Sequence, residues 1–179
     1  NNIAIGVSAG DALTSGKNNV AIGKEAFTRG TTSSENVAIG NNALGQDTYT
    51  SSGSVAIGYF ALGDSTSGAT NIGIGYRAGK GVTTGYDNVI IGTNAGDAIT
   101  TIEGAILIGK DAGTALTTGG RNTAIGFEAL TTAVDLTHNI AIGWQTMKDS
   151  SATTSHRNIG IGSFVMDSVG SNVAADNVA

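Results

Sequence analysis

Asn36-Val37-Ala38-Ile39-Gly40 is one of ten versions of the same pentapeptide, and Asn19-Val20-Ala21-Ile22-Gly23 is the version before it. The glycines that close the ten versions recur every 17 residues, with single gaps of 18 and 19. They are Gly6, Gly23, Gly40, Gly58, Gly75, Gly92, Gly109, Gly126, Gly143 and Gly162. A fixed period of this length is typical of a repeat array, in which each repeat buries its apolar face against its neighbours. We therefore interpret residues 1–179 as a single repeat domain.

Each pentapeptide carries two β-branched positions separated by a small one. Side chains two residues apart in a strand share a face, and β-branched residues suit a pleated surface. We predict that both β-branched columns point into a dry core, and that the small column faces outward against a second chain. The invariant column just before the glycine is the predicted structural core: Ile5, Ile22, Ile39, Ile57, Ile74, Ile91, Ile108, Ile125, Ile142 and Ile161.

The remainder of each repeat predicts a second short strand followed by a turn. Four residues after each glycine lies Gly or a larger residue such as Phe27, Leu44 or Met147, which we expect to fill the core. The Thr-, Ser- and Gly-rich remainder has turn chemistry, and the extra residues of the longer repeats fall there. The sequence therefore predicts an all-β fold, a parallel β-solenoid or β-roll of about ten 17-residue coils.

Composition excludes several classes of protein. Charged residues are 13% of the chain, the net charge is −5 and no basic run occurs, so we expect no nucleic-acid partner. Cysteine is absent, which excludes disulfides and thiolate metal sites. No apolar run approaches the ~20 residues of a membrane span, so we expect no membrane insertion. Because the chain opens and stops inside a repeat, we expect it to be a fragment of a longer fibrous protein.

A single coil of this size encloses a thin core, so we expect self-association. The few Ile and Val of each coil contribute ~25 cal/mol per Å² of buried area against ~1.5 kcal/mol of ordering entropy per residue. Because the apolar burial barely offsets the ordering entropy, we expect a partner chain to be needed. The two terms do not determine the number of chains.

The pentads quoted above resemble the Asn-[Ser/Val/Ile]-Ala-Ile-Gly repeats of YadA-type trimeric autotransporter heads. The resemblance implies a left-handed parallel β-roll, a homotrimer, and adhesion to a host surface. Arg121-Asn122-Thr123-Ala124-Ile125-Gly126-Phe127-Glu128-Ala129-Leu130 resembles repeats of bacteriophage tail fibres and of related fibres that end in a self-cleaving chaperone domain. The adhesin repeat is nearer 14 residues, whereas this repeat has 17, which favours the fibre.

Exposed rings are the candidate surface-binding residues. Two columns after the glycine hold six of the nine aromatic residues: Tyr59, Phe60, Tyr76, Phe127, Trp144 and Phe164. Stacked rings can bind sugar faces or a receptor patch, and the alternative is that they cover the turn or line a seam between subunits. A column of asparagines, Asn2, Asn19, Asn36, Asn71, Asn88, Asn122, Asn139, Asn158 and Asn177, predicts an amide ladder between coils.

The sequence shows no acid/base pair, catalytic triad, cofactor motif or metal-ligand set. We therefore expect no enzymatic activity, no cofactor and no metal. The leading hypothesis is a structural and adhesive segment of a bacteriophage tail fibre that forms or positions a contact with the host surface. The alternatives are a bacterial trimeric adhesin head that binds matrix protein or glycan, and an ice-binding solenoid. The expected partners are its own copies and a cell-surface glycan or protein, and the expected location is a virion or the bacterial cell surface.

Overall fold

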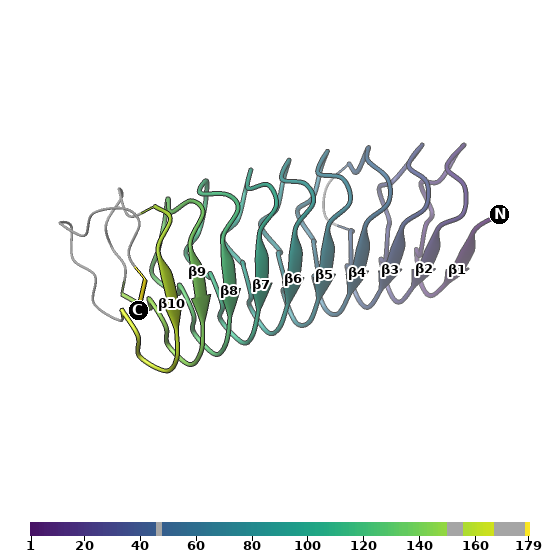
Figure 1. Ribbon diagram of the computed structural model, residues 1–179. Helices are drawn as coiled ribbons and strands as arrows, with labels where there is room; N and C mark the ends of the chain where they lie inside the picture. The colour runs from purple at the N-terminus through teal and green to yellow at the C-terminus, as the bar shows by residue number, and fades with distance from the viewer. Residues whose placement is uncertain (46–47, 150–155, 167–177) are drawn as a thin grey trace.

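The computed structural model describes residues 1–45, 48–149, 156–166 and 178–179, and it forms one tube of stacked coils (Figure 1). Ten parallel strands stack in chain order into one sheet. They are β1 (Ile3–Ile5), β2 (Val20–Ile22), β3 (Val37–Ile39), β4 (Val55–Ile57), β5 (Ile72–Ile74), β6 (Val89–Ile91), β7 (Ile106–Ile108), β8 (Thr123–Ile125), β9 (Ile140–Ile142) and β10 (Ile159–Ile161). We number each coil by its strand. The predicted β-solenoid is confirmed.

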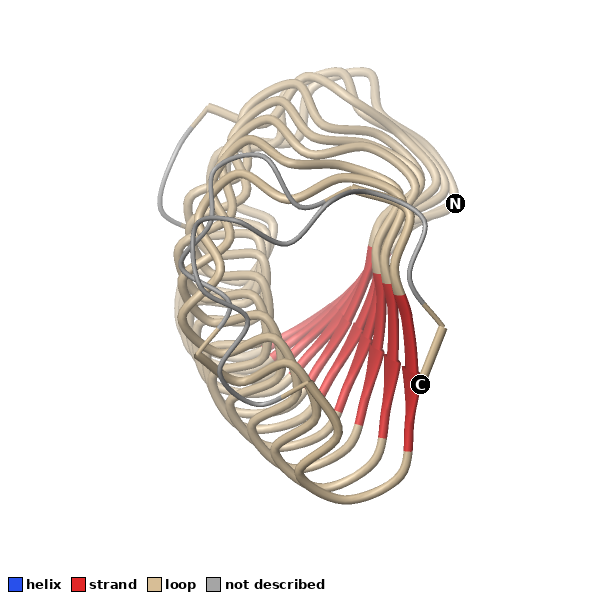
Figure 2. Ribbon diagram, turned by 60° about the vertical axis from the view of Figure 1, so that its left-hand side comes forward, coloured by secondary structure: helices blue, strands red, loops and turns tan. Residues whose placement is uncertain are grey.

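Equivalent residues of successive repeats stand directly above one another. Ile22 pairs with Ile39, for example, and Ile91 pairs with Ile108. Nine such steps at about 4.8 Å make the sheet roughly 43 Å long. At the C-terminal end Val178 forms a parallel bridge with Ile159, so the chain begins another rung there. The strands form one wall of the tube, and loops and turns close the remainder (Figure 2).

The sheet faces the opposite way from the prediction. In β2 to β6, β8 and β9 the middle residue is buried and both flanking residues are only half-buried. Ala21 and Ala38 are fully buried, whereas Ile5 and Ile161 are each 60% exposed at the two ends. The small column therefore lines the interior. The prediction that both β-branched columns fill it is wrong for the single chain, and so is the predicted outward small column.

The ten isoleucines assigned to the core lie on the outer side of the sheet in this chain. They are Ile5, Ile22, Ile39, Ile57, Ile74, Ile91, Ile108, Ile125, Ile142 and Ile161. The interior is too narrow for two β-branched columns, because residues from the opposite wall fill it. A Cβ built on Gly73 of the small column would lie 2.7 Å from Cγ of Leu62.

Side chains inside the tube are matched in size across it. The two large members of the small column, Ile90 and Leu107, face glycines on the opposite wall. A Cβ on Gly79 would lie 2.7 Å from Cδ1 of Ile90, and a Cβ on Gly113 would lie 2.9 Å from Cδ2 of Leu107. Close packing of this kind leaves no free volume for a larger residue.

The segment after each glycine is a turn rather than the predicted second strand. Phe27, Leu44, Leu62, Leu130 and Met147 have φ between +47° and +54°, which is left-handed backbone and not strand. Their side chains are buried, as predicted. Among the described residues the ten strands above form the only sheet, so the second-strand prediction is wrong.

The strand-ending glycines meet two requirements that no other residue meets together. Gly109 has φ +136°, and a Cβ on it would lie 2.3 Å from the carbonyl oxygen of Gly126 in the next coil. Because L-residues avoid this φ and the next backbone occupies the Cβ position, only glycine fits.

The predicted asparagine ladder is confirmed for the described residues, and Asn177 lies outside them. Asn36 donates its backbone N–H and its Nδ2 to Oδ1 of Asn19, at 3.0 and 3.1 Å. Asn88 repeats this pattern on Asn71, at 3.1 and 3.0 Å. Asn19, Asn71 and Asn88 also donate Nδ2 to a carbonyl 14 residues further on, as from Asn88 Nδ2 to Ile102 O at 2.8 Å. The buried side chains therefore replace water as partners of the backbone.

Coil 4 has Ser54 in the asparagine column, and a tyrosine supplies the missing donor. The Tyr49 hydroxyl lies 2.8 Å from Ser54 Oγ and 3.1 Å from the carbonyl oxygen of Gly68, which is 14 residues beyond Ser54. Tyr49 is fully buried, and this burial raises the pKa of its hydroxyl. The hydroxyl thus replaces the amide of the other coils.

We expect Tyr49→Phe to lower the free energy of unfolding by about 1–3 kcal/mol, because the Gly68 carbonyl is left buried without its donor. Thermal unfolding followed by circular dichroism measures the loss. Adding Ser54→Asn to Tyr49→Phe restores the amide of the other coils and should recover most of the stability. An unchanged melting temperature for Tyr49→Phe alone would show that this hydroxyl is not needed.

Candidate functional site

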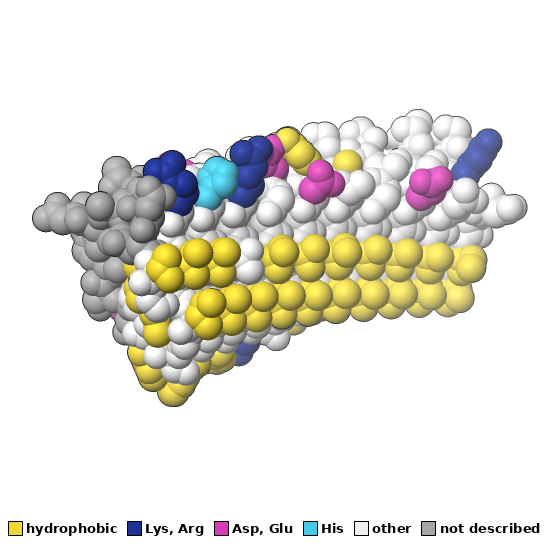
Figure 3. Space-filling view, viewed as in Figure 1, with side chains coloured by type: hydrophobic (Ala, Val, Ile, Leu, Met, Phe, Trp, Pro, Cys, Tyr) yellow, Lys and Arg dark blue, Asp and Glu magenta, His cyan; other side chains and the backbone are white. Residues whose placement is uncertain are grey.

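Two aliphatic stripes cover the outer face of the sheet and form its most regular surface feature. One stripe is the isoleucine column before the glycine. The other is Ile3, Val20, Val37, Val55, Ile72, Val89, Ile106, Thr123, Ile140 and Ile159. Thr123 is the one polar residue in the two columns. Figure 3 shows both stripes running along the whole described sheet. We call this surface the aliphatic face.

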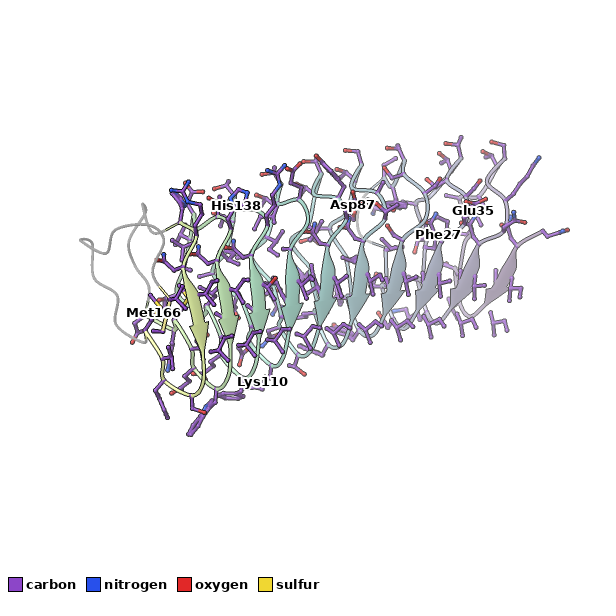
Figure 4. The ribbon with its side chains drawn as sticks, in the orientation of Figure 1. Phe27, Glu35, Asp87, Lys110, His138 and Met166 are labelled. Carbon is purple, nitrogen blue, oxygen red and sulfur yellow. The ribbon has the colours of Figure 1, made fainter. Side chains whose placement is uncertain are left out.

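The aliphatic face is flanked by two edges. The post-glycine edge is made of the two residues after each strand glycine, such as Lys110 and Asp111. The Asn-side edge is made of the two residues before each asparagine-column position, such as Tyr86 and Asp87. Figure 4 places Glu35, Asp87 and His138 along one long side of the sheet and Lys110 along the other.

The six candidate surface-binding rings all lie on the post-glycine edge, and the structure groups them. Tyr59 and Tyr76 stack with centroids 5.3 Å apart and an interplanar angle of 10°. Phe60 packs edge-on against Tyr59 at 4.5 Å, and Trp144 contacts Phe164 at 4.7 Å. Tyr59 and Tyr76, which occupy the same position of adjacent coils, are therefore stacked on each other.

Phe127 lies beside a cation. Lys110 Nζ lies 5.0 Å from the centroid of the Phe127 ring, which is cation–π geometry. Lys110 also pairs with Asp111 at 2.8 Å, and this hydrogen bond raises the pKa of Lys110. The pair Lys110 and Phe127 therefore presents a cation and a ring together on adjacent coils.

A shallow groove of about 240 Å³ accompanies the first ring group. It is lined by Tyr59, Phe60, Tyr76, Arg77 and Lys80. Arg77 pairs with Asp97 and Lys80 pairs with Asp64, each at 2.9 Å. Rings beside fixed polar groups are the chemistry that carbohydrate recognition uses.

The Asn-side edge carries a charged cluster that sequence reasoning missed. The Tyr86 hydroxyl and the Arg121 guanidinium both hydrogen-bond the Glu103 carboxylate. The bond from Tyr86, and next the charge of Arg121, lower the pKa of Glu103. The same carboxylate raises the pKa of Tyr86. The signal was present in the sequence, since the three residues occupy the two edge positions of successive repeats.

Two grooves flank this cluster. One, of about 260 Å³, is lined by Thr101, Glu103, Thr118, Gly120, Arg121, Thr137 and His138. The other, of about 230 Å³, is lined by Tyr86, Asp87, Glu103, Gly104 and Arg121. A glycine stands in each groove, at an edge position that carries a side chain in other coils.

Polar side chains also form hydrogen bonds between successive coils in the threonine-rich turns and on the post-glycine edge. The hydroxyl of Thr83 donates to Thr100 O and that of Thr100 donates to Thr117 O, each at 3.1 Å. These hydroxyl hydrogens are engaged within the protein, which weakens the ice-binding alternative. The Glu128 carboxylate on the post-glycine edge contacts Gln145 at 2.7 Å and Lys148 at 2.9 Å, and the hydrogen bond from Lys148 is the largest cause of the lowered pKa of Glu128.

Within the described ranges no group of three or more His, Cys, Asp or Glu side chains could hold a metal ion. His156 Nδ1 instead lies 2.8 Å from the hydroxyl of Thr137. The same part of the chain contains no helix long and apolar enough to cross a membrane.

Comparison of the chain with protein-family models, with curated proteins and with solved structures found no match.

Proposed function

We propose that this chain is a non-enzymatic fibre segment whose coils are left-handed and whose aliphatic face joins it to two identical chains in a homotrimer. The single observation that carries the proposal is the pair of aliphatic stripes on the outside of the sheet. Nineteen of their twenty side chains are Ile or Val, and no charged residue interrupts them. The count of three chains and the left hand rest on the resemblance of the repeats.

The association supplies burial that the single tube lacks. Inside the tube the strand contributes mostly Ala or Gly, so its interior gains little from the ~25 cal/mol per Å² of apolar burial. The larger strand side chains gain this burial only against another chain. A trimer thus makes a core between chains from the isoleucine column, whose β-branched pattern in the sequence is typical of a core.

Among fibres, a bacteriophage tail fibre is the favoured setting. The 17-residue period and the Ala-Leu endings, such as Ala129-Leu130, resemble tail-fibre repeats more closely than the 14-residue adhesin repeat. The head of a bacterial trimeric adhesin is the second candidate, which the pentads Asn19–Gly23 and Asn36–Gly40 favour. In either setting the rod belongs to a virion or a bacterial cell surface, and it forms or positions the contact with the host surface.

Phe60 gives the most direct test of an adhesive role. Fluorescent wild-type chain should remain on candidate host bacteria after washing, and soluble glycan from the same cells should release it. We expect Phe60→Ala to lower the retained fluorescence roughly threefold to tenfold, because a ring contact is worth about 0.5–1.5 kcal/mol. The matched control is Thr84→Ala in an exposed loop, which should bind like wild type. Loss of the wild-type chain on washing would remove the adhesive role and leave the segment as a spacer, and wild-type retention of Phe60→Ala would remove Phe60 from the contact.

A further inference from the structure

We propose that neighbouring chains lie parallel and in register, with the post-glycine edge of one chain seated on the Asn-side edge of the next at the same coil. In this arrangement Phe127 enters the neighbour's groove at Gly120, and Lys110 enters the neighbour's groove at Gly104. The inference rests on the proposed association through the aliphatic face and specifies how the chains meet.

The direction of the strands fixes which edges meet. Every strand runs across the rod from the Asn-side edge to the post-glycine edge (Figure 1). A rotation about an axis along the rod keeps each coil at its own height. It therefore brings the end of a strand in one chain to the start of the equivalent strand in the next. An antiparallel pair, related by an axis across the rod, would instead bring like edges together.

Side chains at the two edges of the same coil are complementary in size. Large rings on the post-glycine edge share a coil with a small or β-branched residue at the first Asn-side position. The pairs are Tyr59 with Ser52, Tyr76 with Ala69, Phe127 with Gly120, and Trp144 with Thr137. In coil 6 the sizes are exchanged, with Thr93 on the post-glycine edge and Tyr86 on the other. From coil 4 to coil 9, no coil carries an aromatic ring at both of these positions.

Coil 7 shows complementary charge in place of size. Lys110 on the post-glycine edge shares this coil with Glu103, and the groove at Gly104 is also lined by the Asp87 carboxylate. The Arg121 guanidinium lines the same groove and pairs with Glu103, so its two carboxylates and one guanidinium leave a net charge of −1. A lysine that enters the groove meets this net negative charge, and opposite charges across an interface favour the register that aligns them. Coil 2 departs from the pattern, since it carries Lys24 at one edge and Lys17 at the other.

The grooves and the side chains that would fill them are adjacent in the same order. Lys110 and Phe127 lie on neighbouring coils with Nζ 5.0 Å from the ring. The grooves at Gly104 and Gly120 also lie on neighbouring coils, and Glu103 and Arg121 line both. Lys110 of one chain therefore faces the acidic groove at Gly104 of the next. Phe127 faces the neighbour's groove that is open above Gly120. Aromatic anchors in such grooves are typical of the residues that dominate interface energy.

This proposal transfers Tyr59, Tyr76, Phe127 and Trp144 from the candidate cell-surface contact to the seam between chains. Phe60 and Phe164 occupy the second position of the post-glycine edge and remain candidates for an outside ligand.

Photo-cross-linking from position 127 tests the proposal. A benzoyl-phenylalanine placed at position 127 keeps a ring at this site and inserts into C–H bonds within a few ångströms on irradiation. Chains of natural isotope content are mixed with ¹⁵N-labelled chains, dissociated and reassembled, so that mass spectrometry separates links between chains from links within one. We expect links between chains that concentrate in residues 118–121 and 137–138. The same group at position 59 should link to residues 52–53, which checks the register at a second coil.

The outcomes separate this inference from the proposed function. Links to the post-glycine edge of another chain, or to coils more than two away, would overturn the parallel register. A trimer by light scattering that gives no link between chains from position 127 would overturn it as well. A single-chain mass for the wild-type protein would overturn the proposed association itself.

Discussion

Ile90→Asp is expected to abolish cooperative folding of the central coils. Ile90 is fully buried inside the tube, where Cδ1 fills the space that Gly79 leaves open. A carboxylate at this position is desolvated without a partner, which costs several kcal/mol, and truncating the side chain adds a cavity. We expect a loss of roughly 3–5 kcal/mol, and limited proteolysis should cut near coils 5–7.

Ile90→Val is the matched control for this experiment. It keeps an apolar β-branched side chain at the same position and should cost about 0.5–1.5 kcal/mol, with the unfolding transition still cooperative. If Ile90→Asp unfolds at the wild-type temperature, then this side chain is not inside the tube and the assignment of the two faces is wrong.

Ile91→Asp, at the very next residue, is expected to have the opposite phenotype. Ile91 lies on the aliphatic face and is half-buried in the single chain. We expect the variant to keep its strand signal in circular dichroism and to lose association by roughly a hundredfold or more. The reason is that each chain would bring an unpaired carboxylate into the apolar seam, and each ~1.4 kcal/mol changes an association constant tenfold.

Ile91→Thr supplies the control, because the neighbouring stripe already carries a threonine at position 123. It has a shape similar to valine and no charge, so we expect a trimer of reduced stability. Sedimentation velocity distinguishes the three proteins. An Ile91→Asp variant that sediments like wild type would place the association somewhere other than the aliphatic face.

The regular part of the fold was predictable because it depends on spacing alone. The glycine period predicted ten stacked strands in register, and an asparagine repeated at that period lies within hydrogen-bond reach of its copy in the next coil. The invariance of the strand-ending glycine has a physical reason at single residues, since glycine alone tolerates both the φ of +136° at Gly109 and the contact with Gly126.

The two faces of the sheet were assigned wrongly because β-branched columns usually line a core. The decisive signal was in the small column, where the departures Ile90 and Leu107 are apolar and occur beside repeats with glycine four residues after the strand glycine. Exchange of volume between these two positions shows that they share one interior. The predicted core columns, by contrast, accept Thr123. The second strand was predicted wrongly for a similar reason, since apolar residues such as Leu62 reach the interior from left-handed backbone and not from a strand.

The candidate rings were found from the sequence, but their surroundings were not. Stacking of Tyr59 on Tyr76 follows from the repeat period. The grooves at Gly104 and Gly120, and the bonds from Tyr86 and Arg121 to Glu103, depend on how loops of different sequence lie against one another. Pattern alone does not give that geometry.

The molar mass of the unaltered chain in solution tests the central claim most directly, because the aliphatic face is either covered by other chains or open to water. Sedimentation equilibrium at micromolar concentration should give about 53 kDa, which is three times the chain mass of 17.7 kDa. A stable, monodisperse species of 17.7 kDa would contradict the account.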